Sequence, residues 1–184
     1  MDLYNKISEQ LKSIGLADWA NMEDIREIYD SVSRLKPGQT YLEIGVAYGA
    51  SLAVACLAAN PGVDLYGIDS IDQPGRTENI ERFLKLNNKE KPVWVFINSD
   101  SQMEAKSWER GEINVLYIDG DHTEEGVLRD MVSWLPWVEI GGKIIFDDYN
   151  EKTGVKRAVD RIILNNNLYS DFLVDHENFT CHRF

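Results

Sequence analysis

The regular alternation of short apolar runs with amphipathic segments constrains the fold of this 184-residue chain more than any other feature. Five runs rich in β-branched and aromatic residues, at 40–44, 64–68, 93–97, 115–118 and 143–146, are each followed by apolar residues at helical spacing. Such strand–helix alternation predicts a parallel sheet with helices on both faces. Strands this apolar are expected to be buried on both sides.

The two ends of the chain depart from this alternation. Apolar residues recur at helical spacing within residues 3–14 and again within residues 25–32, which predicts two helices before the first strand. Residues 171–174 and 179–183 have the pattern of a closing hairpin, and the histidines there, His176 and His182, are given no role. We therefore predict an N-terminal helical extension or lid over residues 1–35 and a main domain over residues 36–184.

Charge and composition exclude several classes of partner. The formal net charge is -12, with 31 acidic and 19 basic residues and no run of Lys and Arg. A surface that follows nucleic-acid phosphates or anionic lipids is therefore not expected. No apolar run reaches the roughly 20 residues that span a bilayer, and residues 1–35 lack a signal-peptide core. These features predict a cytoplasmic protein, in which Cys56 and Cys181 are buried free thiols.

Acidic residues mark the ends of the predicted strands. Each strand ends with or is closely followed by one of them, namely Glu43, Asp69, Asp100, Asp119 and Asp147. In open α/β sheets, ligands bind beyond the carboxyl ends of the strands. Capping of the following helix could explain one or two of these acids, but not all five. The pattern predicts a polar ligand site at this edge of the sheet.

Two acidic clusters stand out at that edge. Asp119-Gly-Asp121-His122 follows the fourth strand, and Asp147-Asp148 follows the fifth. Carboxylates brought together by adjacent strands repel one another unless a cation or a proton offsets their charge. The clusters therefore indicate a divalent metal beside a histidine. Other interpretations stay open, because Asp121 and His122 could cap the next helix and the Asp pair could form a solvated loop.

The first turn contains two glycines, Gly45 and Gly49, between Glu43 and Ser51. Glycines four residues apart let a backbone approach a ligand closely, although a tight strand-to-helix turn alone would also use them. The spacing differs from the Gly-x-Gly-x-x-Gly of pyrophosphate sites, and Glu43 suits a ligand that carries an ammonium group. Asp69, at the end of the second strand, is placed to accept hydrogen bonds from ribose hydroxyls.

Taken together, residues 40–150 resemble the class I S-adenosylmethionine-dependent methyltransferases. The two acidic clusters make the chain similar to the macrocin and other macrolide-sugar O-methyltransferases, and more distantly to the Mg-dependent catechol and caffeoyl-CoA O-methyltransferases. The resemblance implies a Rossmann-like, doubly wound α/β fold with strand order 3-2-1-4-5-7-6. Its seven-stranded sheet would contain five parallel strands and the C-terminal antiparallel hairpin. Residues 36–184 would be the S-adenosylmethionine-binding methyltransferase domain.

The resemblance also implies roles for individual residues. The cofactor-binding residues would be Glu43, Gly45, Tyr48, Gly49, Ser51, Asp69, Asp100, Ser101 and Asp119. The metal ligands, for Mg²⁺ or another hard divalent cation, would be Asp119, Asp147 and Asp148. His122 would be the catalytic base, with Asp119 as the second catalytic residue. The chain departs from the catechol-type enzymes at Asp148, where those enzymes usually carry Asn.

The expected function is metal-assisted methylation of a hydroxyl on a small molecule, such as a sugar or polyketide-type acceptor. Two alternatives stay open: a non-catalytic cofactor-binding protein and a metal-dependent hydrolase that uses the same acids. The identity of the acceptor does not follow from the sequence.

The chain offers few segments that could cover an acceptor. These are residues 1–35, 71–77 and 150–153. The acceptor pocket is therefore either open or completed by a second copy in a homo-oligomer. Trp19, within the first of these segments, is expected in the core or at an interface rather than as a platform for a substrate.

Overall fold

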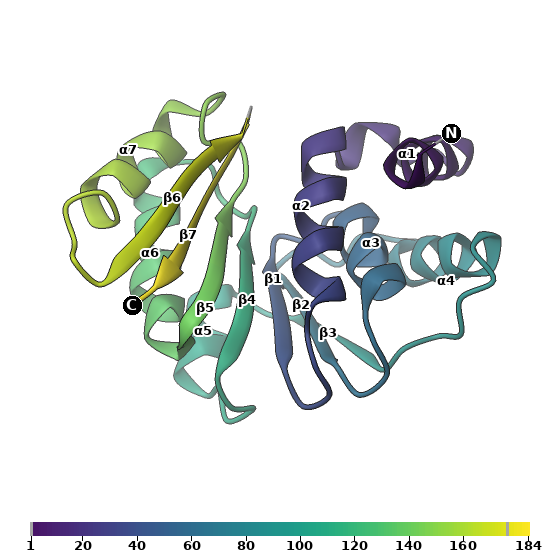
Figure 1. The fold of residues 1–184 in the computed structure, drawn as a ribbon, viewed down its shortest axis with the longest axis horizontal. Coiled ribbons are helices and arrows are strands. Elements are labelled where there is room, and N and C mark those ends of the chain that lie inside the picture. The colour runs from purple at the N-terminus through teal and green to yellow at the C-terminus, as the bar shows by residue number, and fades with distance from the viewer. Residues whose placement is uncertain (1, 176) are drawn as a thin grey trace.

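The computed structural model describes residues 2–175 and 177–184, so His176 lies outside the described residues. Across this part of the chain, seven strands form one sheet in the order β3-β2-β1-β4-β5-β7-β6 (Figure 1). The parallel strands are β1 (Thr40–Ile44), β2 (Asp64–Asp69), β3 (Trp94–Asn98), β4 (Ile113–Ile118) and β5 (Val138–Phe146). The antiparallel hairpin is β6 (Tyr169–Asp175) and β7 (Asn178–Arg183). The Rossmann-like fold and strand order expected from the resemblance are confirmed.

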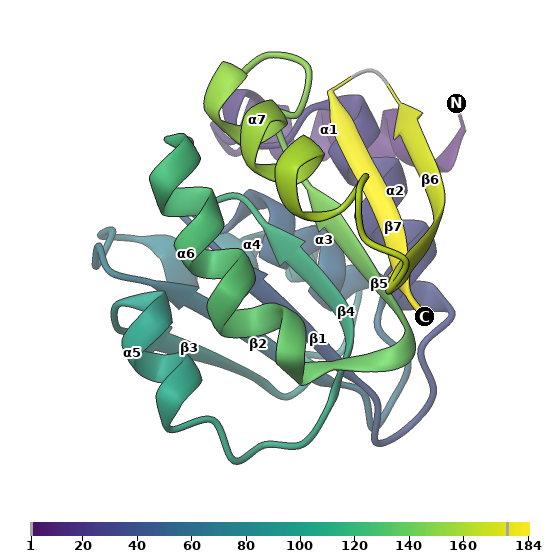
Figure 2. The same cartoon turned by 90° about the vertical axis from the view of Figure 1, so that its left-hand side faces the viewer.

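Helices cover both faces of the sheet (Figures 1 and 2). One face carries α1 (Leu3–Ser13), α2 (Met22–Ser33), α3 (Ala50–Ala58) and α4 (Arg76–Leu86). The other carries α5 (Ser101–Lys106), α6 (Glu124–Trp134) and α7 (Thr153–Ile162). Two short 3₁₀ helices, η1 (Ala17–Trp19) and η2 (Leu135–Trp137), join longer elements. Each layer of helices encloses its own apolar core, and the central strands β1 and β4 are buried on both faces as expected. The expectation was wrong for β3, which lies at the edge of the sheet and whose residues are half-buried or exposed.

The N-terminal helices belong to one of these cores. Ile7 and Leu11 of α1 and Ile25 and Ile28 of α2 are buried in the same cluster as the apolar side chains of α3 and α4. At the start of α2, Asn21 and Asp24 form a capping box, in which the side chain of each accepts a hydrogen bond from the backbone N–H of the other. This packing fixes the direction in which the η1 segment leaves α1 and enters α2. Whether residues 1–35 move as a lid stays a prediction.

The fifth strand is longer than the sequence pattern predicts. The pattern placed a turn at Gly141 and Gly142 before a strand at 143–146, whereas β5 runs from Val138 to Phe146 through both glycines. Gly141 has a φ of +84°, and the pairing with β4 changes register beside it. A bulge of this kind lets the strand continue past residues that do not pair. The predicted turn was therefore wrong, because the bulge absorbs the glycines within the strand.

The turn after β1 is in backbone contact with the turn after β4. Gly45 has a φ of +87°, and a Cβ at this position would overlap the carbonyl oxygen of Asp119 and lie 2.9 Å from the Cα of Gly120. The neighbouring backbone is also tied, because the Asp119 N–H donates to the Ile44 carbonyl over 2.8 Å. Only glycine fits here, since both the backbone conformation and the space exclude a side chain.

Substitution of this glycine tests the contact. Gly45→Ala is expected to lower the free energy of unfolding by about 3 kcal/mol or more, since left-handed strain and steric overlap add. The matched control is Gly15→Ala, because Gly15 has a φ of +84° and a Cβ added there would meet nothing within 4 Å. The control should lose only about 1 kcal/mol. Equal losses in urea unfolding of the two variants would contradict the close contact.

Candidate active site

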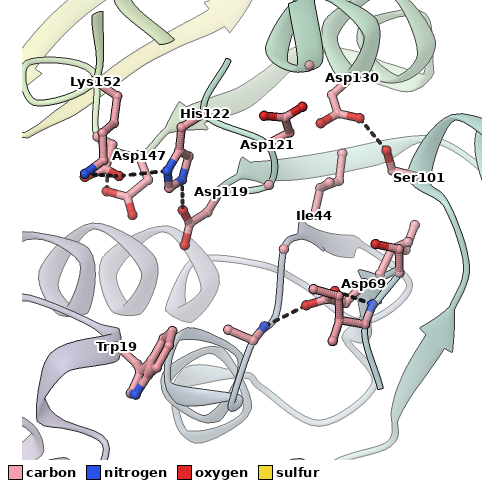
Figure 3. A pocket seen from close by; sticks show the side chains of 18 of the residues that line it. Trp19, Ile44, Asp69, Ser101, Asp119, Asp121, His122, Asp130, Asp147 and Lys152 are labelled. Atoms are coloured by element: carbon pink, nitrogen blue, oxygen red, sulfur yellow. Dashed lines mark hydrogen bonds and ion pairs between the residues drawn. The ribbon is translucent and has the colours of Figure 1, made fainter. Parts of the chain in front are cut away.

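A cleft of about 840 Å³ lies beyond the carboxyl ends of the parallel strands (Figure 3). One part of its wall comes from the turns after β1 and β2, another from the turns after β4 and β5, and a third from the η1 segment. This is the sheet edge at which acidic strand ends predict a ligand site. The cleft therefore places N-terminal residues opposite the strand ends.

His122 lies between two carboxylates at the β4–β5 end of the cleft. Its Nε2 is 3.1 Å from Asp119 Oδ1, and its Nδ1 is 3.4 Å from Asp148 Oδ2. Lys152 Nζ approaches the same Asp148 oxygen at 3.9 Å, so the four side chains form a row (Figure 3). The hydrogen bond to Asp119 and the nearby carboxylates raise the pKa of His122, while burial raises the pKa of Asp119. Ligand atoms of Asp119, His122 and Asp148 all lie within 4.8 Å of one another.

Asp147 lines the cleft but is not part of this cluster of ligand atoms. Its Oδ1 accepts the Asp148 N–H over 2.8 Å, and its carboxyl faces that of Asp24 on α2. Asp24 Oδ1 also accepts from Asn178 Nδ2 over 2.9 Å. Burial, and then repulsion from Asp147, raises the pKa of Asp24 to about 7. Burial, and then repulsion from Asp119 and Asp148, raises the pKa of Asp147 to about 7. The pair therefore holds a proton near neutrality unless a cation replaces it.

Asp121 supports the start of α6, as the helix-cap interpretation of the sequence suggests. Asp121 Oδ1 accepts the Thr123 N–H over 2.9 Å, and Thr123 in turn caps α6 by accepting the Gly126 N–H. Asp121 Oδ2 also lies 3.7 Å from Arg129 Nη2. The side chain therefore lies in the cleft and at the same time organises the start of α6.

Five of the predicted cofactor-binding residues line the cleft: Gly45, Asp69, Asp100, Ser101 and Asp119. Asp69 binds the glycine turn itself, because its Oδ2 accepts from the amides of Val46 and Ala47 at 3.1 and 2.8 Å. Asp100 caps α5 by accepting the Met103 N–H. These two acids thus hold the loops that form the cleft, and a carboxylate retains acceptor sites beyond one or two such bonds.

The other four predicted cofactor residues, Glu43, Tyr48, Gly49 and Ser51, do not line the cleft. Glu43 is fully buried and accepts hydrogen bonds from Tyr41 and Ser51. Burial raises the pKa of Glu43 to about 8, so this group is largely neutral at pH 7. The predicted contact between Glu43 and a cofactor ammonium finds no support in this geometry, because the carboxyl points into the core.

Arg76 at the start of α4 was missed by the sequence analysis. It is buried, donates to the carbonyls of Ala47 and Ile71 at 2.6 and 2.7 Å, and lies 3.4 Å from Asp69 Oδ2. Its guanidinium stacks on Phe96 at 3.8 Å from the ring centroid. Arg76 therefore ties the glycine turn to the loop after β2. A single arginine at the start of a helix carries no sequence signal of this role, since its partner in the glycine turn, Ala47, lies 29 residues away along the chain.

Asp130 on α6 was also missed. It is buried and accepts hydrogen bonds from Ser101 Oγ and from Gln102 Nε2, which begin α5 (Figure 3). It also lies behind Gly120, where an added Cβ would be 3.3 Å from Asp130 Oδ2. Asp130 thus links the turn after β3 to the turn after β4. As a polar residue on an amphipathic helix, it was indistinguishable from a solvent-exposed one in the sequence.

Comparison with known proteins agrees with this geometry. A family model described as a methyltransferase domain matches residues 42–149, which include β1 through the turn after β5. The chain therefore belongs to the methyltransferase domain family, and its fold is that of the class I S-adenosylmethionine-dependent enzymes. The uncharacterized protein R132 of Acanthamoeba polyphaga mimivirus is 30% identical over 144 residues, or 70% of this chain. The chain spans 61% of the length of that relative.

Solved structures show the same fold at low sequence identity. The O-methyltransferase NovP superposes with a TM-score of 0.67 at 19% identity, covering 95% of this chain and 88% of NovP. The O-methyltransferase from Bacillus cereus, solved in complex with SAH, gives 0.66 at 17% identity, covering 96% and 89% of the two chains. CalS11, a TDP-rhamnose 3'-O-methyltransferase, gives 0.67 at 14% identity, covering 97% and 93%.

Among residues 2–175 and 177–184, no helix has the length and apolar character that crossing a membrane requires.

The buried pair of Asp24 and Asp147 predicts a pH-dependent stability. Because the folded-state pKa values are raised to about 7, the folded chain binds protons more tightly than the unfolded chain. The contribution of this pair to the free energy of unfolding is therefore fully present below about pH 4 and is lost as the pH rises through about 7. Asp24→Asn should raise the Tm at pH 8 by about 2–4 °C, the shift that 1 kcal/mol produces at this size. At pH 5 the change should be small.

The measurement is thermal unfolding from pH 5 to pH 9 with and without Mg²⁺. The neighbouring Asn178 Oδ1 has no partner in the described structure, so it can accept from the new amide after a flip. Glu109→Gln, an exposed site, is the control and should change the Tm equally at all pH values. A loss of Tm at pH 8 in Asp24→Asn would contradict the repulsion between the two carboxyls.

Arg76→Lys tests the tie between the glycine turn and the loop after β2. Lysine keeps the charge but cannot donate to two carbonyls in the planar arrangement of a guanidinium. Backbone amides of residues 45–49 should then exchange hydrogen at least about tenfold faster, the effect of 1.4 kcal/mol on local opening. Mass-spectrometric hydrogen exchange measures this, with the exposed Arg82→Lys as control. Unchanged exchange in Arg76→Lys would show that Arg76 does not hold the turn.

Proposed function

We propose that this protein catalyses S-adenosylmethionine-dependent O-methylation of a small molecule, assisted by a divalent cation. The observation that carries the proposal is the position of His122. Its imidazole lies between Asp119 and Asp148 at one end of the cleft whose other end contains the glycine turn and Asp69. A proton acceptor and a nucleoside-binding turn thus share one cavity, which is the arrangement that methyl transfer to a hydroxyl needs.

The cofactor is proposed to lie along the turns after β1, β2 and β3. Gly45 lines the cleft, and its missing side chain lets this turn pack on the backbone of Asp119, so that main-chain atoms of the turn face the proposed cofactor. Asp69 Oδ1 accepts a single backbone hydrogen bond, from Ile71, and therefore has acceptor capacity left for a ribose hydroxyl. Ser101 and Gln102, fixed by Asp130, lie where the adenine is expected. The positions of Glu43 and Ser51 in the core support an indirect role, through the shape of the turn.

The residues present fit a hard divalent cation. Carboxylates are the ligands that Mg²⁺ prefers, and Asp119 and Asp148 offer oxygens within the same 4.8 Å cluster. Burial, and then repulsion from Asp119 and Asp148, raises the pKa of Asp147 to about 7, and a cation would offset the repulsion. Asp119 and Asp148 are proposed to hold the ion, with Asp147 as the third predicted ligand. When bound, the cation would orient the acceptor hydroxyl and lower its pKa.

His122 is proposed to accept the proton of the acceptor hydroxyl. The hydroxyl oxygen forms a bond to the methyl carbon as the bond from carbon to sulfur breaks, and the electron pair of that bond stays on sulfur. The proton of the hydroxyl passes to the imidazole, which must be neutral beforehand. The carboxylates raise the pKa of His122 and so hold a proton on it. Offsetting their charge with a cation would therefore also favour the neutral imidazole.

The cleft and the net charge support proposals for the partners and the location of the protein. A hydroxyl-bearing small molecule is proposed as acceptor because the cleft is enclosed by three parts of the chain. The net charge of -12 supports the absence of nucleic-acid and membrane partners, and the protein is proposed to work in the cytoplasm. We also propose a homo-oligomer, in which a second copy of the chain would complete the acceptor side of the cleft.

His122→Asn is expected to separate binding from chemistry. The variant should bind S-adenosylmethionine in Mg²⁺ buffer with unchanged affinity by calorimetry, since His122 lies at the opposite end of the cleft from the glycine turn. Release of S-adenosylhomocysteine with a library of hydroxylated small molecules should fall by about 10²–10⁴-fold, the usual contribution of a general base. His182→Asn, on β7 outside the cleft, is the control and should retain full activity.

Three results would count against the proposal. Absence of S-adenosylmethionine binding by the wild-type protein would remove the cofactor. Full turnover in His122→Asn would remove the base, and Mg²⁺-dependent ester hydrolysis without cofactor affinity would favour the hydrolase alternative.

A further inference from the structure

Trp19 is a large aromatic side chain in the wall of the cleft. It belongs to η1, between α1 and α2, and remains 47% exposed. Its ring lies 4.5 Å from that of Tyr48, centroid to centroid, at an angle of 53°. Figure 3 shows Trp19 across the cleft from His122 and Asp119. The sequence favoured a core or interface position for Trp19; the exposed position in the cleft excludes the core, and an interface stays a prediction.

The indole is held in place although it is exposed. Leu16 and Ala20, on either side of η1, are buried in the core, and Asn21 caps α2. Tyr48, which contacts the indole, belongs to the glycine turn and its carbonyl accepts from Asn79 Nδ2 over 3.1 Å. The anchored flanks and the aromatic partner together fix a flat aromatic surface in the wall of the cleft. Such a surface is typical of the face on which a ring-shaped ligand stacks.

The charge of the cleft selects among ring-shaped ligands. Only Arg129 and Lys152 are lysine or arginine side chains in its described lining. The acidic residues of the lining are Asp18, Asp24, Asp69, Asp100, Asp119, Asp121, Asp130, Asp147, Asp148, Glu151 and Glu177. A divalent cation at Asp119 and Asp148 and a proton shared by the buried pair would offset only part of this excess. A ligand with phosphate or carboxylate groups is therefore repelled, and one with an ammonium group is attracted.

Acidic groups also lie on the same side of the cleft as Trp19. Asp18 precedes it in η1, and Glu177 accepts a hydrogen bond from Asn21 Nδ2 over 2.5 Å. A cation that stands over an indole face is attracted by the ring itself. The aromatic surface and these carboxylates therefore favour the same chemistry, a ring with a positive charge.

We propose that Trp19 is a specificity-determining residue and that the acceptor is a ring alcohol that carries an amine. The ring stacks on Trp19, the ammonium group faces the acidic wall, and the hydroxyl points across the cleft to His122. The inference rests on the proposed methyltransferase function and narrows its acceptor class. It excludes nucleoside-diphosphate sugars and coenzyme A thioesters as acceptors.

Two matched sets of ring alcohols test the charge preference. The catechol set is dopamine, 4-methylcatechol and 3,4-dihydroxyphenylacetate, which share the metal-chelating group and differ in charge. The sugar set is glucosamine, glucose and glucuronate. Each compound is titrated by calorimetry into protein saturated with Mg²⁺ and S-adenosylhomocysteine. In at least one set the amine should bind ten times or more tighter than the carboxylate, and 0.5 M NaCl should reduce that ratio.

Variants test the role of Trp19. Trp19→Ala should raise the Kd of the amine probe at least tenfold, and Trp19→Phe should raise it less. Neither variant should change the Kd for S-adenosylhomocysteine. Phe184→Ala is the control, because Phe184 is exposed and lies outside the cleft. The Tm of each variant shows that it is folded. Asp18→Asn should lower the preference for the amine over the neutral ring.

The outcomes distinguish this inference from the proposed function. If the wild-type protein does not bind S-adenosylhomocysteine, the methyltransferase proposal fails. If it binds the cofactor product but no amine probe, or binds rings without regard to charge, the acceptor class is wrong and methyl transfer stands. Unchanged amine affinity in a folded Trp19→Ala variant would show that the ring does not stack there.

Discussion

The backbone contact between Gly45 and the end of β4 is the constraint on which the rest of the site depends. Because no side chain fits between Gly45 and the Asp119 carbonyl, the turn after β1 rests directly on the turn after β4. The first turn forms the part of the cleft proposed to hold the nucleoside, and the second begins the row of Asp119, His122 and Asp148. Asp69 and Arg76 then fasten the first turn from its other side. The distance between the two ends is thus fixed by main-chain atoms.

The sequence predicted the architecture well because periodicity reports burial. The central strands are buried and mostly apolar, so the number and positions of the strands were clear, although β3 at the edge of the sheet is largely unburied. The bulge at Gly141 extends β5 well beyond its apolar run. The acidic strand ends also pointed to the correct edge of the sheet. Sequence position could not show where a side chain points, however. Glu43 follows the same pattern as Asp69, yet it is buried among core residues while Asp69 lines the cleft.

The residues that the sequence missed share a physical cause. Asp24, Arg76 and Asp130 each act on a loop that is distant in the chain, and their local patterns are those of ordinary helix termini and surfaces. Asp24 shows this most clearly, because it forms the capping box of α2 and also faces Asp147. From the sequence alone, capping of α2 is a sufficient reason for an aspartate at position 24. The second role becomes visible only once the sheet brings β5 beside α2.

The contact between Trp19 and Tyr48 has a consequence for how the two halves of the cleft respond to ligands. Tyr48 belongs to the glycine turn, and Trp19 belongs to the segment that enters α2. The aromatic pair therefore places the wall proposed for the acceptor directly against the turn proposed for the cofactor. A cofactor bound at this turn would form part of the surface that the acceptor meets, so the proposed order of binding is cofactor first.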